Sequence, residues 1–106
     1  MEVPSILLNR ILSDLAKKNG SDLHLSVGSA PMIRASGEFQ PLAGQEIITS
    51  EILNKIIETF LSQEEIVRLK ETRGLVLVRN LANFRFRINV FYEKAFWPHL
   101  SIMFRT

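Results

Sequence analysis

The sequence predicts an α+β domain in which helices pack on an antiparallel sheet of about six strands. Side chains alternate between apolar and polar from Phe84 to Tyr92, which is typical of a half-buried strand. Apolar pairs recur four residues apart between Ile52 and Leu61, which indicates a helix that lies flat on a sheet. The predicted elements follow the order helix, three strands, two helices, three strands. Hairpins can link strands in this order, so we expect antiparallel pairing.

The composition supports one folded domain. The chain has 106 residues, of which 46% are hydrophobic, and it has no cysteine. This apolar content can build a core, while the missing thiols exclude disulfide frameworks and thiolate metal sites. No apolar run approaches the ~20 residues of a membrane span, and the N-terminus lacks a secretory signal pattern. We therefore expect a soluble, intracellular domain.

Charge is divided unevenly along the chain. Residues 1–67 carry five basic and nine acidic side chains, a net of −4, whereas residues 68–106 carry eight and two, a net of +6. A domain with one acidic and one basic half is suited to docking on a partner. The basic excess is small and the aromatic residues fall mostly on predicted apolar faces, so a nucleic-acid partner is not expected.

Residues 4–19 are predicted to form the first helix. Pro4 suits its first turn, and Asn19-Gly20 is a good stop because glycine tolerates a left-handed terminal residue. The helix has one apolar stripe, made of Leu7, Leu8, Ile11, Leu12 and Leu15.

Three short strands are predicted next, at residues 21–27, 32–35 and 38–42, with a tight turn at Ser36-Gly37. Asp22 and His24 share one face of the first strand. They could be half of a metal site or an acid–base pair, but divalent sites need three or four converging ligands and no third ligand is adjacent. We expect a hydrogen-bonded pair on a strand at the sheet edge and no metal.

Two helices follow in the middle of the chain. Thr49 or Ser50 can cap the first, which spans the apolar stripe from Ile52 to Leu61. Ser62 and Glu65 match a capping box that starts the second. This helix is predicted to end at residues 73–74, with its apolar side chains, Ile66 and Leu69, facing inward.

The last three strands carry the strongest pattern. Residues 75–78 are fully apolar, residues 80–83 are turn-like, and the alternation of residues 84–92 follows. A turn at residues 94–95 leads to a final strand, residues 96–105, with Phe96, Leu100, Ile102 and Phe104 on its inner face. Pro98 cannot donate to a ladder, which predicts that this strand begins at an edge or bulge.

Arg85 and Arg87 are the first candidate functional residues. They lie two positions apart, so both guanidinium groups project from the outer face of the same strand. The pair can be a solvated polar face, or it can offer two planar donor groups to an anion or carboxylate.

Catalytic signatures are missing from the sequence. The five glycines, at positions 20, 28, 37, 44 and 74, form neither a G-x-x-x-x-G-K-S/T phosphate loop nor a G-x-G-x-x-G turn. There is no serine nucleophile elbow or cysteine nucleophile, and His24 and His99 are single candidate bases without an obvious partner. We expect no self-sufficient active site in these residues.

Three blocks in this chain resemble a known family. The blocks are Gly20–Gly28 (GSDLHLSVG), Pro31–Arg34 with Gly37 closing the hairpin, and Arg85–Phe91 (RFRINVF). Together they resemble the N-terminal domain of the PilT-like twitching-motility ATPases, which belong to the secretion ATPases of type IV pili and type II secretion. The resemblance spans nearly the whole chain and keeps the order of the motifs.

The resemblance implies a PAS-like domain over residues 1–106 that normally precedes a RecA-like ATPase domain, which this chain lacks. It implies a homo-hexamer in which the small domain docks on ATPase domains of its own and the adjacent subunit. ATP and magnesium would then be cofactors of the full-length protein and not of this fragment. A pilus or secretion platform at the inner membrane would be a partner, which places the protein in the cytoplasm or peripherally at that membrane.

The family's nucleotide-contacting arginines can be carried over to this sequence. Arg85 and Arg87 match the motif directly, Arg105 resembles the arginine that ends the last strand, and Arg34 the one in the hairpin block. Two other functions remain open at this point: a free-standing PAS-like domain that holds a small ligand in its core without catalysis, and, with less support, a nucleic-acid binder that uses the arginine strand.

Overall fold

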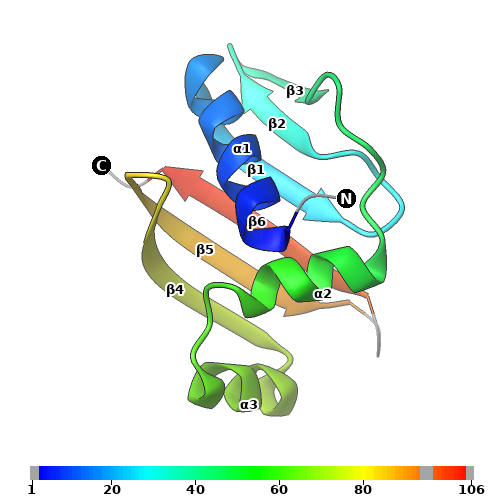
Figure 1. The fold of residues 1–106 in the computed structure, drawn as a ribbon, viewed down its shortest axis with the longest axis vertical. Helices are drawn as coiled ribbons and strands as arrows, with labels where there is room; N and C mark the ends of the chain where they lie inside the picture. Colours follow the sequence, from blue (N-terminus) through cyan, green and yellow to red (C-terminus); the bar gives the residue numbers. More distant parts are fainter. Residues whose placement is uncertain (1–2, 94–96, 105–106) are drawn as a thin grey trace.

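The computed structural model describes residues 3–93 and 97–104 and confirms the predicted fold class and element order (Figure 1). Three helices and six strands are present in the described residues. In chain order they are α1 (Pro4–Lys17), β1 (Gly20–Ser26), β2 (Met32–Ala35), β3 (Glu38–Pro41), α2 (Ser50–Glu58), α3 (Gln63–Thr72), β4 (Gly74–Leu81), β5 (Phe84–Tyr92) and β6 (Pro98–Phe104). None of these helices is long and apolar enough to cross a membrane.

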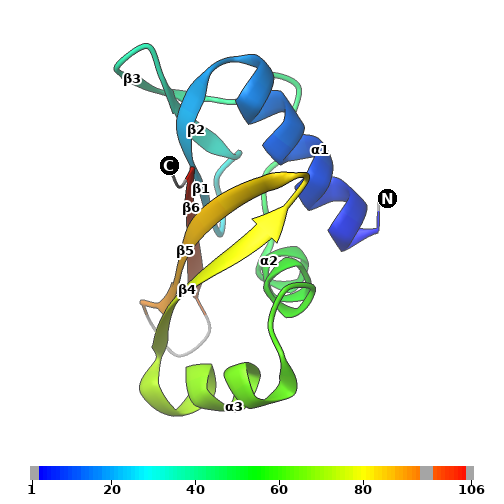
Figure 2. The same ribbon diagram turned by 90° about the vertical axis from the view of Figure 1, so that its left-hand side faces the viewer.

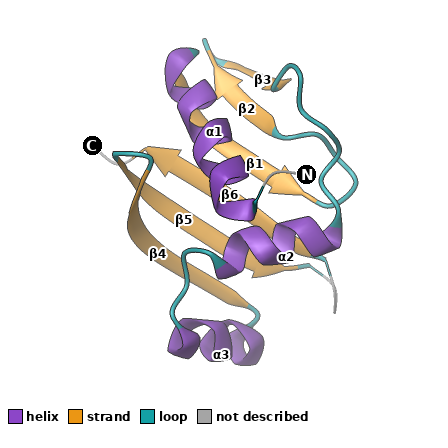
Figure 3. Cartoon of the chain, viewed as in Figure 1, coloured by secondary structure: helices purple, strands orange, loops and turns teal. Residues whose placement is uncertain are grey.

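The strands form one antiparallel sheet with the order β3-β2-β1-β6-β5-β4. The first and last strands, β1 and β6, therefore meet in the centre, where Leu23 pairs with Ile102 and Leu25 with Leu100. Helices α1 and α2 lie on one face of this sheet, and α3 sits beside its β4 end (Figures 2 and 3). In residues 3–93 and 97–104, the opposite face carries no helix.

The core lies between the sheet and the helices. The apolar stripes predicted for the helices form the helix side of the core, and alternate residues of the strands form its sheet side. Fully buried members include Ile11, Leu12, Leu15, Leu53, Ile56, Leu23, Phe86, Ile88, Val90 and Ile102. Gly20 lets β1 pass close beneath α1, because a Cβ atom there would lie 2.3 Å from Leu15 Cδ1.

Both predicted helix starts in the middle of the chain are confirmed. The Thr49 hydroxyl accepts a hydrogen bond from Ile52 N at 3.2 Å, which caps α2. Ser62 and Glu65 form the expected reciprocal capping box at the start of α3. These local bonds satisfy N–H groups that the first turn of a helix leaves without partners.

Several local predictions were wrong at the ends of elements. Asn80 and Leu81 belong to β4, because residues 82 and 83 alone form the hairpin turn, with φ angles of 50° and 67°. Pro98 begins a central strand without a bulge, since a first residue loses no ladder bond. The Asp22–His24 strand is likewise central, not at an edge. The left-handed residue that ends α1 is Asn19, not the glycine that follows it.

Candidate functional site

The helix-free side of the sheet, hereafter the open face, is formed by the alternate strand residues that point away from the core. Its side chains are mainly polar, aromatic and basic. The strand registers place the following residues on it: Phe39, Arg34, Met32, Asp22, His24, Ser26, His99, Ser101, Met103, Arg85, Arg87, Asn89, Phe91, Val76, Val78 and Asn80.

Arg85 and Arg87 project from β5 on this face, as the alternation predicts. Both are exposed, and neither makes an ion pair or a side-chain hydrogen bond within residues 3–93 and 97–104. Arg87 lies opposite Val78 on β4 and Met103 on β6, and Arg85 lies opposite Asn80. No carboxylate stands directly across from either guanidinium group in these registers, so both remain available to an external anion.

Arg34 belongs to a different part of the open face. It lies opposite Asp22, with Arg34 Nε 3.7 Å from Asp22 Oδ1, and its guanidinium group is 5.5 Å from the centre of the Phe39 ring. Three strand spacings, about 14 Å, separate its backbone from that of Arg87. The structure therefore does not bring Arg34 together with the β5 pair. Arg105, the fourth candidate, lies outside the described residues.

A hydrogen-bonded cluster joins β1 to β6 on the open face. Asp22, which is only 9% exposed, bonds to His24 Nε2 through Oδ2 and accepts from the Ser21 hydroxyl at 2.6 Å through Oδ1. Ser101 Oγ lies 3.0 Å from His24 Nδ1 on the neighbouring strand. Burial raises the pKa of Asp22, but hydrogen bonds from Ser21 and His24 and the charge of Arg34 outweigh it, so the net pKa is lowered.

The Ser101–His24–Asp22 chain resembles a nucleophilic relay in its composition, but its setting is unsuited to acyl transfer. Ser101 lies in the middle of β6, which pairs with β1 on one side and β5 on the other. Backbone N–H groups there are used in the ladder and cannot form an oxyanion hole. Within the described residues, no cluster of three His, Cys, Asp or Glu side chains could hold a metal ion. The cluster is best interpreted as structural: its side-chain hydrogen bonds link the central strands β1 and β6.

Exposed apolar side chains occupy the other end of the open face. Phe91 stacks on His99 with ring centres 4.9 Å apart, and His99 Nε2 lies 2.7 Å from Glu93 Oε2. Val76 is 56% exposed and Trp97 is 48% exposed. The alternation of residues 84–92 places Phe91 on the outer face, but sequence patterns did not predict the exposure of Val76, because an all-apolar strand such as residues 75–78 does not reveal which side chains face solvent. A surface that carries both arginines and exposed aromatic rings is typical of a protein-docking surface.

The Arg79–Glu65 ion pair on the covered face was not predicted from the sequence. Arg79 projects inward from β4, donates from Nε to Phe60 O at 3.2 Å, and bonds to the Glu65 carboxylate. Glu65 also accepts from Ser62 N at 2.8 Å. The hydrogen bonds from Arg79 and Ser62 lower the pKa of Glu65 to about 2. This pair fastens α3 to β4; the only sequence signal was a charged residue at an inward position of an apolar strand.

No protein-family model and no curated protein matches the sequence. Solved structures do match. The pilus retraction motor PilT with bound ADP has a TM-score of 0.81 and 22% identity over 90% of this chain. The ATPase DotB of Legionella pneumophila has a TM-score of 0.80 and 12% identity over 96%. The ATPase DotB of Yersinia pseudotuberculosis has a TM-score of 0.73 and 12% identity over 93% of this chain.

This chain spans less than a third of each matched protein, 28% of PilT and 29% of each DotB. At these identities the matches establish the fold and not the activity. They confirm, at the level of the fold, the resemblance that the three sequence blocks suggested. The chain folds like a domain-sized part of the PilT and DotB ATPases.

Proposed function

We propose that this chain is the N-terminal regulatory and oligomer-interface domain of a pilus retraction (twitching-motility) or related secretion ATPase. In this proposal the open face docks on the RecA-like ATPase domain of a neighbouring subunit in a hexamer. The observation that carries it is the pair Arg85 and Arg87: two exposed arginines without partners among the residues that the structure describes, on the open face of a fold shared with PilT.

Physical chemistry favours nucleotide phosphates as the target of this pair. Guanidinium groups stay charged at all physiological pH values and bind phosphate oxygens in a planar, two-pronged geometry. Strand β5 pairs with β4 from residue 84 to residue 91 and with β6 from residue 86 to residue 92, so its arginines are presented from a rigid support. A pair so placed would distinguish ATP from ADP by the terminal phosphate and pass that difference on as rigid-body motion between domains. ATP and magnesium would be held by the ATPase domain.

The test is an Arg87→Ala substitution in a full-length motor that contains this domain. If Arg87 acts on the transferring phosphate, ATP turnover should fall by about 10³-fold, the lower end for arginine fingers. Arg68→Ala is the matched control, because Arg68 is exposed on α3, away from the open face. Turnover and hexamer formation that both equal the unsubstituted motor would contradict the proposal.

The alternative of a ligand-sensing domain that binds a small molecule in its core has less support. The space between the sheet and the helices is occupied by aliphatic side chains and Phe86, and many of them have no solvent exposure. A core ligand would have to displace these side chains, which pack as a continuous cluster.

A further inference from the structure

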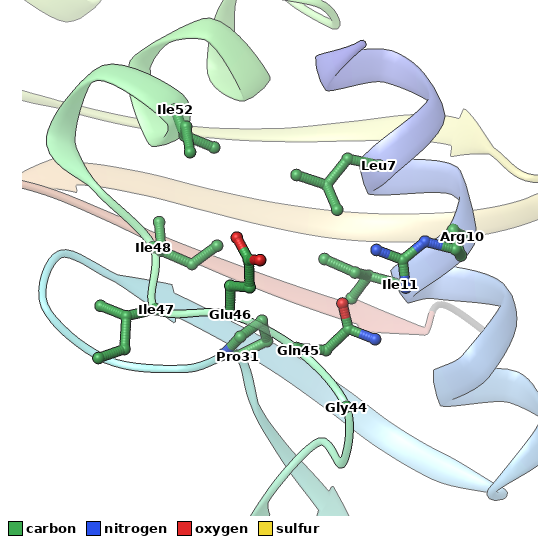
Figure 4. A pocket seen from close by; sticks show the side chains of 10 residues that line it. All are labelled: Leu7, Arg10, Ile11, Pro31, Gly44, Gln45, Glu46, Ile47, Ile48 and Ile52. Atoms are coloured by element: carbon green, nitrogen blue, oxygen red, sulfur yellow. The ribbon is translucent and has the colours of Figure 1, made fainter. Parts of the chain in front are cut away.

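A groove lies on the helix side of the molecule, away from the open face. Its walls are α1, the start of α2 and the irregular segment 43–48, and its volume is about 510 Å³ (Figure 4). The lining includes five leucine or isoleucine residues: Leu7, Ile11, Ile47, Ile48 and Ile52. A concave apolar surface of this size is in the range that binds ligands or peptide side chains.

Part of the backbone of one wall makes no hydrogen bond to the described residues of the fold. Segment 43–48 is held at its two ends, where Leu42 N bonds to Pro31 O at 2.8 Å and Ile48 N bonds to Ser29 O at 2.9 Å. Between these anchors, Glu46 and Ile47 make no backbone hydrogen bond to any residue that the structure describes. Their N–H and C=O groups can therefore pair with the backbone of an extended segment laid beside them.

Two charged side chains line the groove, Arg10 and Glu46. Figure 4 shows the Glu46 carboxylate directed into the groove, and in the described part of the chain it has no ion pair. Arg10 is the basic residue of the lining, and its Nη1 lies 4.0 Å from Asp14 Oδ2 on the same helix. The unmatched charge is thus negative, and a cationic group is its complement.

Exposed apolar side chains form part of the groove lining, at Ile47, and continue beyond it at Val3 and Ile6. Ile47 is 63% exposed, Val3 57% and Ile6 56%. Helical spacing places Val3 one turn before Leu7 and Ile6 one turn before Arg10, so both lie beside the lining. An apolar rim of this kind marks a site for a macromolecule more than for a small solute.

We propose that this groove binds an extended segment of a partner protein that carries a large aliphatic side chain next to lysine or arginine. The aliphatic group packs between Leu7 and Ile52, the cation pairs with Glu46, and the backbone bonds to residues 46–47. An α-helix fits less well, because its backbone groups are already bonded internally. This inference does not depend on the proposed function, since the groove and the arginine pair occupy different faces.

The test is an NMR titration of the 106-residue chain, labelled with ¹⁵N, by an acetylated and amidated nonapeptide. The probe has leucine at its centre, lysine on both sides and Gly-Ser repeats at its ends. We expect amide shifts at residues 43–48 and in the first turns of α1, with a Kd on the order of 100 μM. Replacing the central leucine by alanine, or both lysines by glutamate, should weaken binding at least about tenfold.

Two substitutions locate the site. Glu46→Gln should weaken binding of the lysine peptide about fivefold to tenfold, whereas Glu51→Gln should leave it unchanged, because Glu51 is already paired with Lys55 at 3.1 Å. The proposal is overturned by an absence of shifts at about 2 mM peptide, by equal binding of the glutamate peptide, or by shifts confined to the open face. Shifts that depend on protein concentration without peptide would assign the groove to a second copy of the chain and would also overturn it.

Discussion

At the scale of single residues, the two glycines that begin strands differ in how much space surrounds them. A Cβ atom on Gly20 would lie 2.3 Å from Leu15 Cδ1 and 3.2 Å from Arg34 O. A Cβ atom on Gly74 would meet only ordinary contacts, 3.7 Å from Val90 O and 3.8 Å from Phe91 Cβ. Neither glycine has a positive φ angle, so space and not backbone strain decides the effect of a substitution.

This contrast gives a matched pair of substitutions. Gly20→Ala should lower the free energy of unfolding by about 1–3 kcal/mol, because the fully buried Leu15 side chain would have to shift within a packed core and Arg34 O would be crowded. Gly74→Ala should change it by less than about 1 kcal/mol, in the stabilising direction, because alanine restricts the unfolded chain. Urea denaturation of both variants checks this. Equal destabilisation by the two would show that α1 does not pack on β1 as closely as described.

The candidate arginines show what single-residue patterns can and cannot predict. Alternation along residues 84–92 was enough to place Arg85 and Arg87 on the outer face, because the period of a strand fixes the face of each side chain. It could not reveal that Arg34 is engaged by Asp22, since that contact depends on which strands are neighbours and in which register. A resemblance to a family can suggest the role of a residue such as Arg34, but it does not show which side chain of this protein that residue contacts.

At the scale of elements, the helices were more predictable than the strand ends. A capping box and an apolar stripe are local signals, so the start of α3 at Ser62 was correct. The end of β4 depended on a two-residue turn with two left-handed residues, Ala82 and Asn83. Alanine is not typical of that conformation, and the sequence therefore favoured a longer turn.

The attachment of α3 to β4 through Glu65 and Arg79 should depend on pH. The pKa of Glu65 is lowered from 4.5 to about 2 in the folded protein, so its contribution to stability is present above pH 4.5 and is lost as pH falls toward 2. Arg79 keeps a third of its side chain exposed, so solvent screening limits the contribution to about 1–2 kcal/mol.

Glu65→Gln tests this contribution. At pH 7 the variant should be less stable than the parent protein by about 1–2 kcal/mol, and the difference should shrink steadily between pH 4.5 and pH 3. Glu64→Gln, on the same turn but exposed, is the control and should have little effect at either pH. A Glu65→Gln difference that stays constant over this range would mean that the carboxylate is not held by Arg79 in solution.

At the scale of the whole molecule, the sheet depends on pairing between its first and last strands, which are the farthest apart in the sequence. Leu23 on β1 pairs with Ile102 on β6, and this ladder joins the β1–β3 half of the sheet to the β4–β6 half. Residue patterns predicted six strands but not their order, because nothing local in β1 or β6 specifies the other. The Asp22–His24–Ser101 cluster lies between the same two strands and adds side-chain hydrogen bonds to their pairing.

Amide hydrogen exchange tests this arrangement. Central strands open only when most of the structure opens, whereas edge strands can separate locally. We expect the slowest exchange in β1 and β6, whose inward residues Leu23, Leu25 and Ile102 are at most 1% exposed. Amide exchange should be fastest in β3, a four-residue edge strand whose residues are all exposed. If β1 and β6 instead exchange as fast as β3, the two halves separate readily in solution. The open face would then be a hinged surface and could not present Arg87 in a fixed position relative to Asp22.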